Sequence, residues 1–595
     1  MQKQRVVFRS ILIVAIMLLA SMAVIGQSAA GSASQTATSN ATTGQTIKVG
    51  WFGTYIDTLN PFLSYSELTA WINMNVYLPL VSYDAGNKTI VPALASSWDI
   101  NYANHTVIFH LNPSAVWSDG VPVTSADVVY SYNTAAQNYS FVASEVSAIS
   151  SVKAIGTETV MVTFSGVLWT MWAASIFVVP AHVWSTVNAS TYAGYNSTGS
   201  QYFVGDGPFV LTNYVPNQYA QIEKNAKFFI RSEMPTIGTV IFEEFTSQSS
   251  AVSSLQAGSI QGLTGILPAD VANFQGNAKF NVTTSPSIEY FYLSINVAPY
   301  GKGNPTLRNL SVRQAIAHAL NLTYIADTVY HGYATTLDSV LSPTNQYYWS
   351  NLTTYAYNPS LANSLLNQSG FTTYTSGGIR ENANNTSQQL SYTVLVPSGD
   401  SLEVDAANIM ATNLSKIGIK LNVQAETTGS MAATIWPNLT QDMDLWDWFD
   451  NIQSAPQLLS VFLSNQVVTG TSDSGYTNTT YDNLWAKLLN ATSQAQAMAI
   501  SGQMQEMLAQ QLPYIPLFSP SAINVYSSTL TNISSSYPGG PFGGLDYQTF
   551  TQLVVKSPSS PPSNNNTLYY ILGGVAVVIV AAAAVAVVAM RRRKA

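Results

Sequence analysis

The densest group of chemically capable side chains lies between Asp442 and Asp450, where the sequence reads DMDLWDWFD. This segment places four carboxylates and two indoles within nine residues. Paired carboxylates can act as general acid and general base, as in glycoside hydrolysis. They can also receive a cation, because a charge that leaves water needs an oppositely charged partner. The segment is therefore the first candidate for a functional site.

Other signs of catalysis are weak. Glu243 and Glu244 form a second acidic pair, but adjacent residues of a strand point to opposite faces. The chain has no GxSxG, HExxH, Walker A or GxGxxG motif, and its five histidines, at positions 105, 110, 182, 318 and 331, lack metal-ligand spacing. It also has no cysteine, which excludes disulfides and thiolate chemistry. We predict that the protein is not an enzyme and has no catalytic residue, metal or cofactor.

The elements that must position these side chains alternate between strand and helix patterns. Residues 46–50 and 106–111 have strand character, and residues 315–329 have helical spacing. Residues 406–414 also have helical spacing and lead through Gly418 into an alternating strand at 419–423. The interleaving predicts an α/β fold without short repeats.

The two ends of the chain predict its compartment. Residues 1–30 have the basic, apolar and small-residue regions of a signal peptide, and a Ser/Thr-rich linker follows at 31–45. A Pro/Ser/Asn-rich stalk at 557–567 precedes an uncharged apolar run at 568–590, which is long enough to cross a bilayer. The basic tail at 591–595 is expected to stay in the cytoplasm. We therefore predict a cell-surface ectodomain anchored in the plasma membrane by a C-terminal transmembrane helix.

The predicted ectodomain is strongly acidic. It holds all 30 acidic residues but only 15 of the 22 basic ones, a formal net charge of −15, so nucleic acid is not an expected partner. Nearly twenty Asn-x-Ser/Thr sequons run from Asn40 to Asn565 and predict a glycoprotein. With only 9% charged residues and a C-terminal anchor, the composition points to an archaeal surface.

Several segments resemble a known family. Between Val76 and Tyr132 the chain contains VYLPLVSYD, VPALASSWDI, VIFHL and VWSDGVPVTSADVVYSY, and later GDGPFVL, VRQAIAHAL and LPYIPLF. In order and spacing they resemble the extracytoplasmic solute-binding proteins of the oligopeptide and dipeptide ABC importer class, family 5 of the bacterial extracellular solute-binding proteins. The resemblance covers nearly the whole ectodomain.

The recognisable motifs have structural explanations of their own. Asp119 and Gly120 form a turn pair, and Thr124 with Asp127 is typical of the start of a helix. Trp117 is expected in the core. Arg313 and His318 belong to a helix with an apolar face, and we assign neither of them to the site.

The resemblance implies a two-lobed, periplasmic-binding-protein-like α/β fold of class II type, with an extra domain inserted in the first lobe. Lobe I would comprise 46–83, 202–281 and 512–556, the extra domain 84–201, and lobe II 282–511. A solute would be enclosed between the lobes, and closure would create the surface that a membrane permease recognises. The implied function is the substrate-binding subunit of an ABC importer, whose partners are the solute, the permease and the ATPase subunits.

The resemblance also implies site residues. Trp448 and Asp450 match a tryptophan and an aspartate in a loop that receives the α-ammonium group of a bound peptide. The family usually has two residues between them, whereas here only Phe449 intervenes. The full set of predicted ligand-binding residues is Asp450, Trp448, Trp446, Asp447, Tyr65, Ser66, Glu67, Tyr290, Tyr292 and Trp436.

Two alternatives stay open. The same fold binds oligosaccharides in some members, and aromatic side chains such as those of Trp436, Trp446 and Trp448 would then stack on sugar rings. The alternative of another class is a surface hydrolase or a structural surface glycoprotein.

Overall fold

The computed structural model describes fifteen stretches of the chain, all after Thr43. These are residues 44–52, 56, 58–62, 66–84, 87–138, 149–166, 176–186, 203–287, 289–299, 302–436, 438–449, 456–469, 472–533, 540 and 548–555. No helix within these stretches is long and apolar enough to cross a membrane. The predicted signal peptide, stalk, transmembrane span and basic tail lie outside the described residues.

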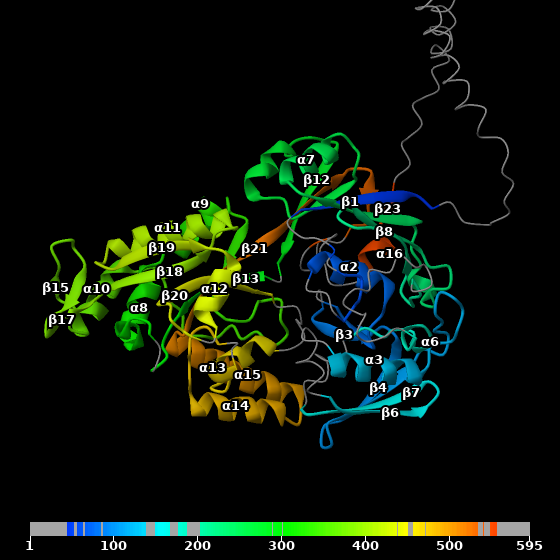
Figure 1. The fold of residues 1–595 in the computed structure, drawn as a ribbon, viewed down its shortest axis with the longest axis horizontal. Helices are drawn as coiled ribbons and strands as arrows, with labels where there is room; N and C mark the ends of the chain where they lie inside the picture. Colours follow the sequence, from blue (N-terminus) through cyan, green and yellow to red (C-terminus); the bar gives the residue numbers. More distant parts are fainter. Residues whose placement is uncertain are drawn as a thin grey trace, which may run out of the picture. The chain divides into compact units, whose positions relative to one another are not determined.

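A twelve-stranded mixed sheet organises the fold, and one long strand, β21 (Tyr514–Ser527), belongs to two groups of strands within it. The first half of β21 pairs with β13 (Glu289–Ile295), and the second half pairs with β11 (Gly262–Thr264) and β12 (Phe280–Pro286). Figure 1 shows β21 passing between the two groups. The predicted α/β class is confirmed.

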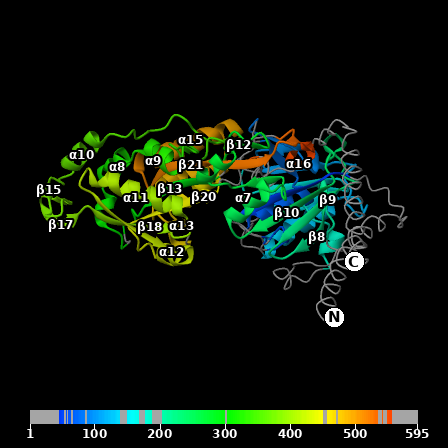
Figure 2. The same ribbon diagram turned by 90° about the horizontal axis from the view of Figure 1, so that it is seen from above.

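Each group is completed by strands from distant parts of the sequence. Beside β13 lie β20 (Met443–Phe449), β18 (Ser391–Pro397) and β19 (Lys420–Glu426), and β14 (Ala334–Thr336) pairs with β21. Beside β11 lie β1 (Thr46–Phe52), β10 (Thr239–Phe245), β9 (Tyr219–Lys224) and β8 (Phe209–Val215). The last three lie side by side in Figure 2.

The chain crosses between the two groups twice. One crossover joins β12 to β13, and the other lies inside β21 near Ser519. The Ser519 hydroxyl donates a hydrogen bond of 2.7 Å to the carbonyl oxygen of Glu289, which ties the two crossovers together.

A separate four-stranded antiparallel sheet has the order β4, β5, β7, β6. Its strands are β4 (Ala95–Asn101), β5 (Thr106–Leu111), β6 (Ile149–Gly156) and β7 (Thr159–Phe164), and the hairpin of β2 (Val81–Asp84) and β3 (Thr89–Pro92) precedes it. A small sheet of β15 (Thr373–Tyr374), β16 (Arg380–Asn382) and β17 (Asn385–Gln389) lies elsewhere in the chain. A two-stranded ladder of β22 (Leu530–Thr531) and β23 (Val554–Val555) follows β21.

The described residues also form helices. They are α2 (Glu67–Val76), α3 (Ser125–Asn138), α6 (Ala181–Trp184), α7 (Gln248–Gln256), α8 (Leu310–Ala319), α9 (Leu322–Val329), α10 (Pro359–Gln368), α11 (Ser401–Ser415), α12 (Thr428–Ile435), α13 (Gln466–Thr469), α14 (Thr479–Leu489), α15 (Gln494–Gln511) and α16 (Gln548–Gln552). Short 3-10 turns are η3 (Arg231–Glu233), η4 (Pro268–Asn273), η5 (Pro305–Arg308) and η6 (Gln457–Phe462).

The most recognisable motif is structural, as predicted. Trp117 is fully buried, and Asp119 accepts a hydrogen bond from the backbone N–H of Val121 across a turn in which Gly120 has a φ of +101°. The backbone N–H of Thr124 donates to Asp127 at 2.8 Å, at the start of α3. Turn, cap and helix start therefore explain the segment without a ligand.

Arg313 is also structural. It is buried in α8, and its guanidinium donates to the backbone oxygens of Leu307, Arg308 and Gln511. It therefore anchors the end of α15 to the start of α8.

The prediction of one helix over 315–329 is wrong. α8 ends at Ala319, and α9 begins at Leu322 after Asn321, whose side chain accepts from the backbone N–H of Tyr324 at 3.1 Å. The apolar spacing continues across this break, which is why the pattern alone reads as one helix. The predicted helix at 406–414 is confirmed within α11, and the predicted strand at 419–423 is confirmed from Lys420, where β19 begins.

The glycines of the GDGPF segment allow two chain segments to touch. A Cβ atom on Gly207 would collide with the backbone oxygen of Asn75, and the carboxylate of buried Asp206 accepts from the backbone N–H of Leu78 at 2.9 Å. The close approach of the two backbones leaves no room for a side chain at Gly207.

We expect Gly207→Ala to destabilise the fold by roughly 1–3 kcal/mol, because backbone atoms cannot move aside as side chains do. Urea unfolding would measure the change. Gly429→Ala is the matched control, since a Cβ there meets nothing within 4 Å and the site lies inside α12. An equal loss in both variants would contradict the packing explanation.

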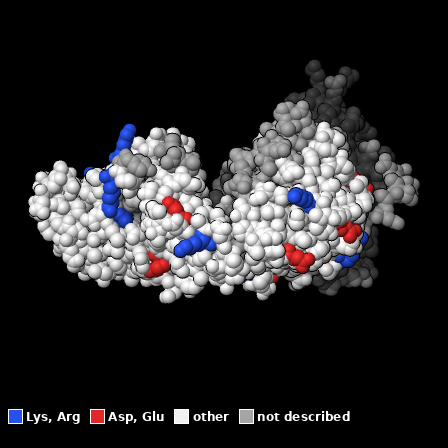
Figure 3. All heavy atoms as spheres, turned by 90° about the horizontal axis from the view of Figure 1, so that it is seen from below, with Lys and Arg blue, Asp and Glu red and all other residues white. Residues whose placement is uncertain are grey.

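The surface follows from the composition. On the face drawn in Figure 3, charged side chains are few and separated by wide areas of uncharged residues. With 9% charged residues in the whole chain, the solvent boundary consists mainly of neutral polar and apolar groups.

Candidate functional site

The antiparallel pair β13 and β20 forms the centre of the candidate site. In their register Tyr290 lies opposite Trp448, and Tyr292 lies opposite Trp446. Because side chains alternate along a strand, these four aromatic residues share one face of the sheet, which we call the aromatic face. Asp447 lies opposite Phe291 and therefore belongs to the other face. The structure thus separates Asp447 from the two tryptophans between which it stands in the sequence.

The rings of the aromatic face are stacked. Tyr292 and Tyr514 have ring centroids 4.0 Å apart and planes within 11°, and Tyr292 and Trp448 have centroids 6.4 Å apart and planes within 9°. The Trp448 indole N–H donates to the Tyr514 hydroxyl at 3.4 Å. Trp446 meets Trp436, which follows α12, edge to face at 5.4 Å.

The burial of these rings differs. Tyr290 and Tyr292 are fully buried, whereas Trp436, Trp446 and Trp448 are half-buried. The tyrosines therefore form a rigid back wall, and the indoles are the groups that a solute can reach. Indoles offer a flat apolar surface for stacking, which suits apolar side chains and sugar rings alike.

A buried carboxyl network lies on the same side of the sheet as the aromatic face, because Asp444 and Trp446 are two residues apart on β20. Asp473 has no exposed surface and accepts hydrogen bonds from the hydroxyls of Tyr292, at 2.8 Å, and of Tyr514. Gln441 donates through Nε2 to Asp444 at 3.1 Å and to the backbone oxygen of Asp473 at 2.7 Å. The network fixes the two tyrosines and, through Tyr514, the indole of Trp448.

Burial governs the protonation of this network. Desolvation raises the pKa of Asp473 to about 6, although hydrogen bonds from Tyr514 and Tyr292 act in the opposite direction. Desolvation, with the nearby charge of Asp473, raises the pKa of Asp444 well above its usual value. The two carboxyls therefore do not both carry a charge readily.

The other predicted site residues are placed as follows. Ser66 is the N-cap of α2 and accepts from the backbone N–H of Thr69, and Glu67 begins that helix. Tyr65 and Asp450 lie outside the described residues. Sequence reasoning missed Asp473 as a site residue, because nothing around SDSG at 472–475 marks it and its two tyrosine partners come from β13 and β21.

The second acidic pair is not a joint site. Glu243 forms an ion pair of 2.6 Å with Lys48, and Glu244 accepts from the backbone N–H of Ile56. Each carboxylate therefore has its own structural partner.

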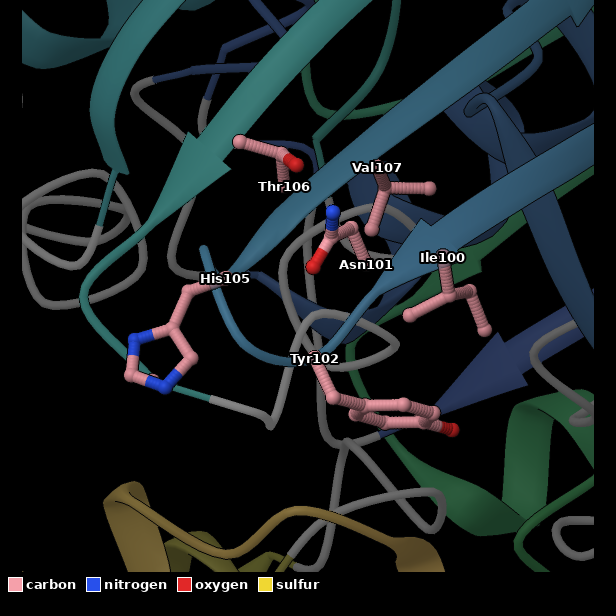
Figure 4. Close-up of a pocket in the computed structure, with 7 residues that line it drawn as sticks. Ile100, Asn101, Tyr102, His105, Thr106 and Val107 are labelled. Atoms are coloured by element: carbon pink, nitrogen blue, oxygen red, sulfur yellow. The ribbon is translucent and has the colours of Figure 1, made fainter.

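A small pocket lies at the turn between β4 and β5 (Figure 4). It is lined by Ile100, Asn101, Tyr102, His105, Thr106, Val107 and Gly166. No carboxylate belongs to this lining, and within the described stretches no group of three or more His, Cys, Asp or Glu side chains is arranged to hold a metal ion. The aromatic face is the better candidate for solute contact.

A family model matches more than half of the chain. Residues 89–470 match the family described as "Bacterial extracellular solute-binding proteins, family 5 Middle". A putative ABC transporter peptide-binding protein of Brucella ovis is 28% identical over 331 residues, which are 54% of this chain and 59% of the relative. The nickel-binding periplasmic protein of Escherichia coli is 25% identical over 381 residues, 63% of this chain and 70% of the relative.

A solved structure supports the fold. The oligopeptide-binding protein AppA of Bacillus subtilis, in complex with a nonapeptide, matches with a TM-score of 0.68 at 20% identity, covering 86% of this chain and 100% of AppA. The match with the Brucella protein spans less than two thirds of that protein's length. The relatives bind different solutes, so the solute of this chain must be inferred from its own site.

Proposed function

Since the chain belongs to family 5 of the bacterial extracellular solute-binding proteins, we propose that it is the substrate-binding subunit of an ABC importer and captures peptides. The observation that carries this proposal is the aromatic face, which stands on β13 and β20 next to the crossovers between the two strand groups. A solute that stacks on Trp446 and Trp448 would lie where movement of one group against the other could enclose it.

The proposal includes the predicted lobes and anchor. Lobe I at 46–83, 202–281 and 512–556 and lobe II at 282–511 would close on the solute, with the extra domain at 84–201 attached to the first. The run at 568–590 would hold the ectodomain at the cell surface, beside the permease that receives the solute. Asp450 follows β20 directly and would receive the ammonium group of a peptide.

Oligosaccharide capture is the second candidate. The half-buried indoles of Trp436, Trp446 and Trp448 favour it, because sugar rings present flat apolar faces to such groups. The two candidates differ in one respect that can be measured, since a peptide brings a charged amino terminus and a neutral sugar does not.

A binding panel tests the proposal. Melting the full-length protein with peptides, N-acetylated peptides and oligosaccharides should show stabilisation by peptides of about 2.7 kcal/mol at a hundredfold excess over Kd. The N-acetylated forms should bind more weakly, because they lack the ammonium group. Stabilisation by sugars alone would replace the peptide proposal, and turnover of any ligand would contradict the binding role.

Trp448→Ala should weaken the binding of whichever solute stabilises the protein by roughly tenfold or more, since stacking on an aromatic ring contributes about 0.5–1.5 kcal/mol beyond the buried area. Trp98→Ala, in the four-stranded sheet, is the matched control for loss of a half-buried indole. Equal weakening in both variants would remove the aromatic face from the site.

A further inference from the structure

The side of the sheet opposite the aromatic face has a group of carboxyls that come from several elements. Asp447 projects to this side, and Glu289 shares it, because residues 289 and 291 of β13 lie opposite residues 449 and 447 of β20. Helix α11 packs on β18 in the same region and brings two more, Asp400 at its N-cap and Glu403 in its first turn. The charges of all four act on one buried group, the hydroxyl of Tyr330 after α9, so four carboxyls from three elements lie around it.

One of these carboxyls is buried, and one of its oxygens lacks a hydrogen-bond partner within the described stretches. Glu403 is 1% exposed, and in the described part of the chain its Oε2 atom has no hydrogen-bond partner. Asp400, by contrast, accepts from the backbone N–H groups of Leu402 and Glu403. A buried carboxyl oxygen without a hydrogen-bond donor is costly, so its presence calls for an explanation.

A second, independent orphan lies in the same place. Tyr330, at the end of α9, is 2% exposed, and its hydroxyl also lacks a partner among the described residues. The centroid of its ring lies 4.8 Å from that of Phe518 and 6.5 Å from that of Phe291. Phe291 lies opposite Asp447 in the pairing of β13 with β20. The four carboxyls all act on this hydroxyl and, after burial, raise its pKa.

Among the residues that the structure describes, the charges that act on Glu403 all have the same sign. Burial, followed by the charges of Asp400, Asp447 and Glu289, raises the pKa of Glu403 to about 10. Burial and the charge of Asp400 raise that of Asp447 to about 6. The groups that act on Glu403 or are acted on by it, from α11, β20, β13 and α9, are thus three acids and a tyrosine, and a cation beside Glu403 would offset the repulsion that acts on it.

We propose that this cluster of Asp400, Glu403, Asp447, Glu289 and Tyr330 is a binding site for a primary ammonium group. The ammonium supplies three N–H donors, and the oxygens of Glu403 and Tyr330 that lack a hydrogen-bond partner in the described part of the chain can accept from them. Binding converts Glu403 from the carboxylic acid to the carboxylate, and the released proton goes to solvent.

This site is distinct from the aromatic face and needs no assumption about the transported solute. It also includes groups at both crossovers, Glu289 at the start of β13 and Phe518 in β21.

The test uses 1,5-diaminopentane, with 1,5-pentanediol as the neutral probe of similar length, on the full-length protein. The diamine should raise the melting temperature and release protons, which calorimetry in two buffers of different ionisation enthalpy measures. Its affinity should increase by up to about tenfold per pH unit between pH 6 and pH 9, as expected when one proton leaves on binding. The diol should have no effect.

Glu403→Gln should abolish the proton release and weaken diamine binding by about tenfold or more, because a charge-assisted contact is lost. Asp405→Asn removes the same charge from an exposed position of α11 and should change neither. The proposal would be overturned if Glu403→Gln still bound the diamine and released a proton. It would also be overturned if the diol stabilised the protein equally, or if the affinity for the diamine fell as the pH rises. Diamine binding that fails while peptides still stabilise the protein would remove this site and leave the proposed function standing.

Discussion

Asp473→Ala is expected to destabilise the protein by roughly 3–5 kcal/mol at pH 5, because two buried tyrosine hydroxyls lose their common acceptor and each orphaned group costs about 1–3 kcal/mol. The stacked rings of Tyr292 and Tyr514 would also lose their anchor. Denaturant unfolding at pH 5 measures the effect.

The loss should be smaller at pH 7. There the Asp473 carboxyl, whose pKa is about 6, is ionised in the folded protein, and burying that charge already lowers the stability of the unsubstituted chain. Asp473→Asn is the matched control, since its amide oxygen still accepts one hydrogen bond, and it should lose less than the alanine variant. Losses of equal size for alanine and asparagine would show that the hydroxyl contacts do not stabilise the fold.

The free energy of unfolding is expected to fall as the pH rises from 4 to 8. Glu403, Asp447 and Asp473 have folded-state pKa values of about 10, 6 and 6, each above its unfolded value near 4. The folded state therefore binds these protons more tightly than the unfolded state does. Their stabilising contribution is complete below pH 4 and is lost as the pH rises, between 4 and 6 for the two aspartates and between 4.5 and 10 for Glu403.

Glu403→Gln should remove much of this dependence of the free energy of unfolding on pH, because a neutral amide does not titrate. At pH 7 the free energy of unfolding is lower than at acid pH, and Glu403 alone accounts for on the order of 3 kcal/mol of this difference. Unfolding in urea at pH 4, 5, 6, 7 and 8 measures the pH dependence of the free energy of unfolding for the unsubstituted protein and for the variant. Asp405→Asn provides the control for removal of one charge from α11.

Some carboxyls act in the opposite direction. The pKa values of Asp119, Glu426 and Glu506 are lowered, mainly through hydrogen bonds that outweigh any burial, and these groups add stability as the pH rises. They lie nearer to solvent than Glu403, so water screens their contribution. A wild-type stability that stays constant or rises between pH 5 and pH 8 would contradict the predicted dominance of the buried acids.

Local pattern predicts much of the fold but not its interruptions. The strand at 106–111 is found with the bounds that alternation gives, because β5 buries every second residue. The break between α8 and α9 escapes the same reasoning, since apolar residues recur at helical spacing on both sides of it. Asn321 was the available signal, because its side chain caps a helix start.

The candidate site shows where a linear sequence misleads. Trp446, Asp447 and Trp448 are adjacent, and proximity groups them as one site, yet strand alternation sends the aspartate to the opposite face. Asp473 shows the reverse, because it joins Tyr292 and Tyr514 only through tertiary packing across long stretches of chain. No spacing rule connects residues that three separate elements bring together.

The position of β21 also governs when the protein can finish folding. This strand stands between β13 and β11 in the sheet, but it is made only after some five hundred residues have left the ribosome. Until then β13 and β11 both present unpaired backbone edges, which invite pairing with other chains. A nascent chain that lacks β21 is therefore prone to wrong pairing and to chaperone binding, and the synthesis of β21 allows both groups of strands to be completed at once.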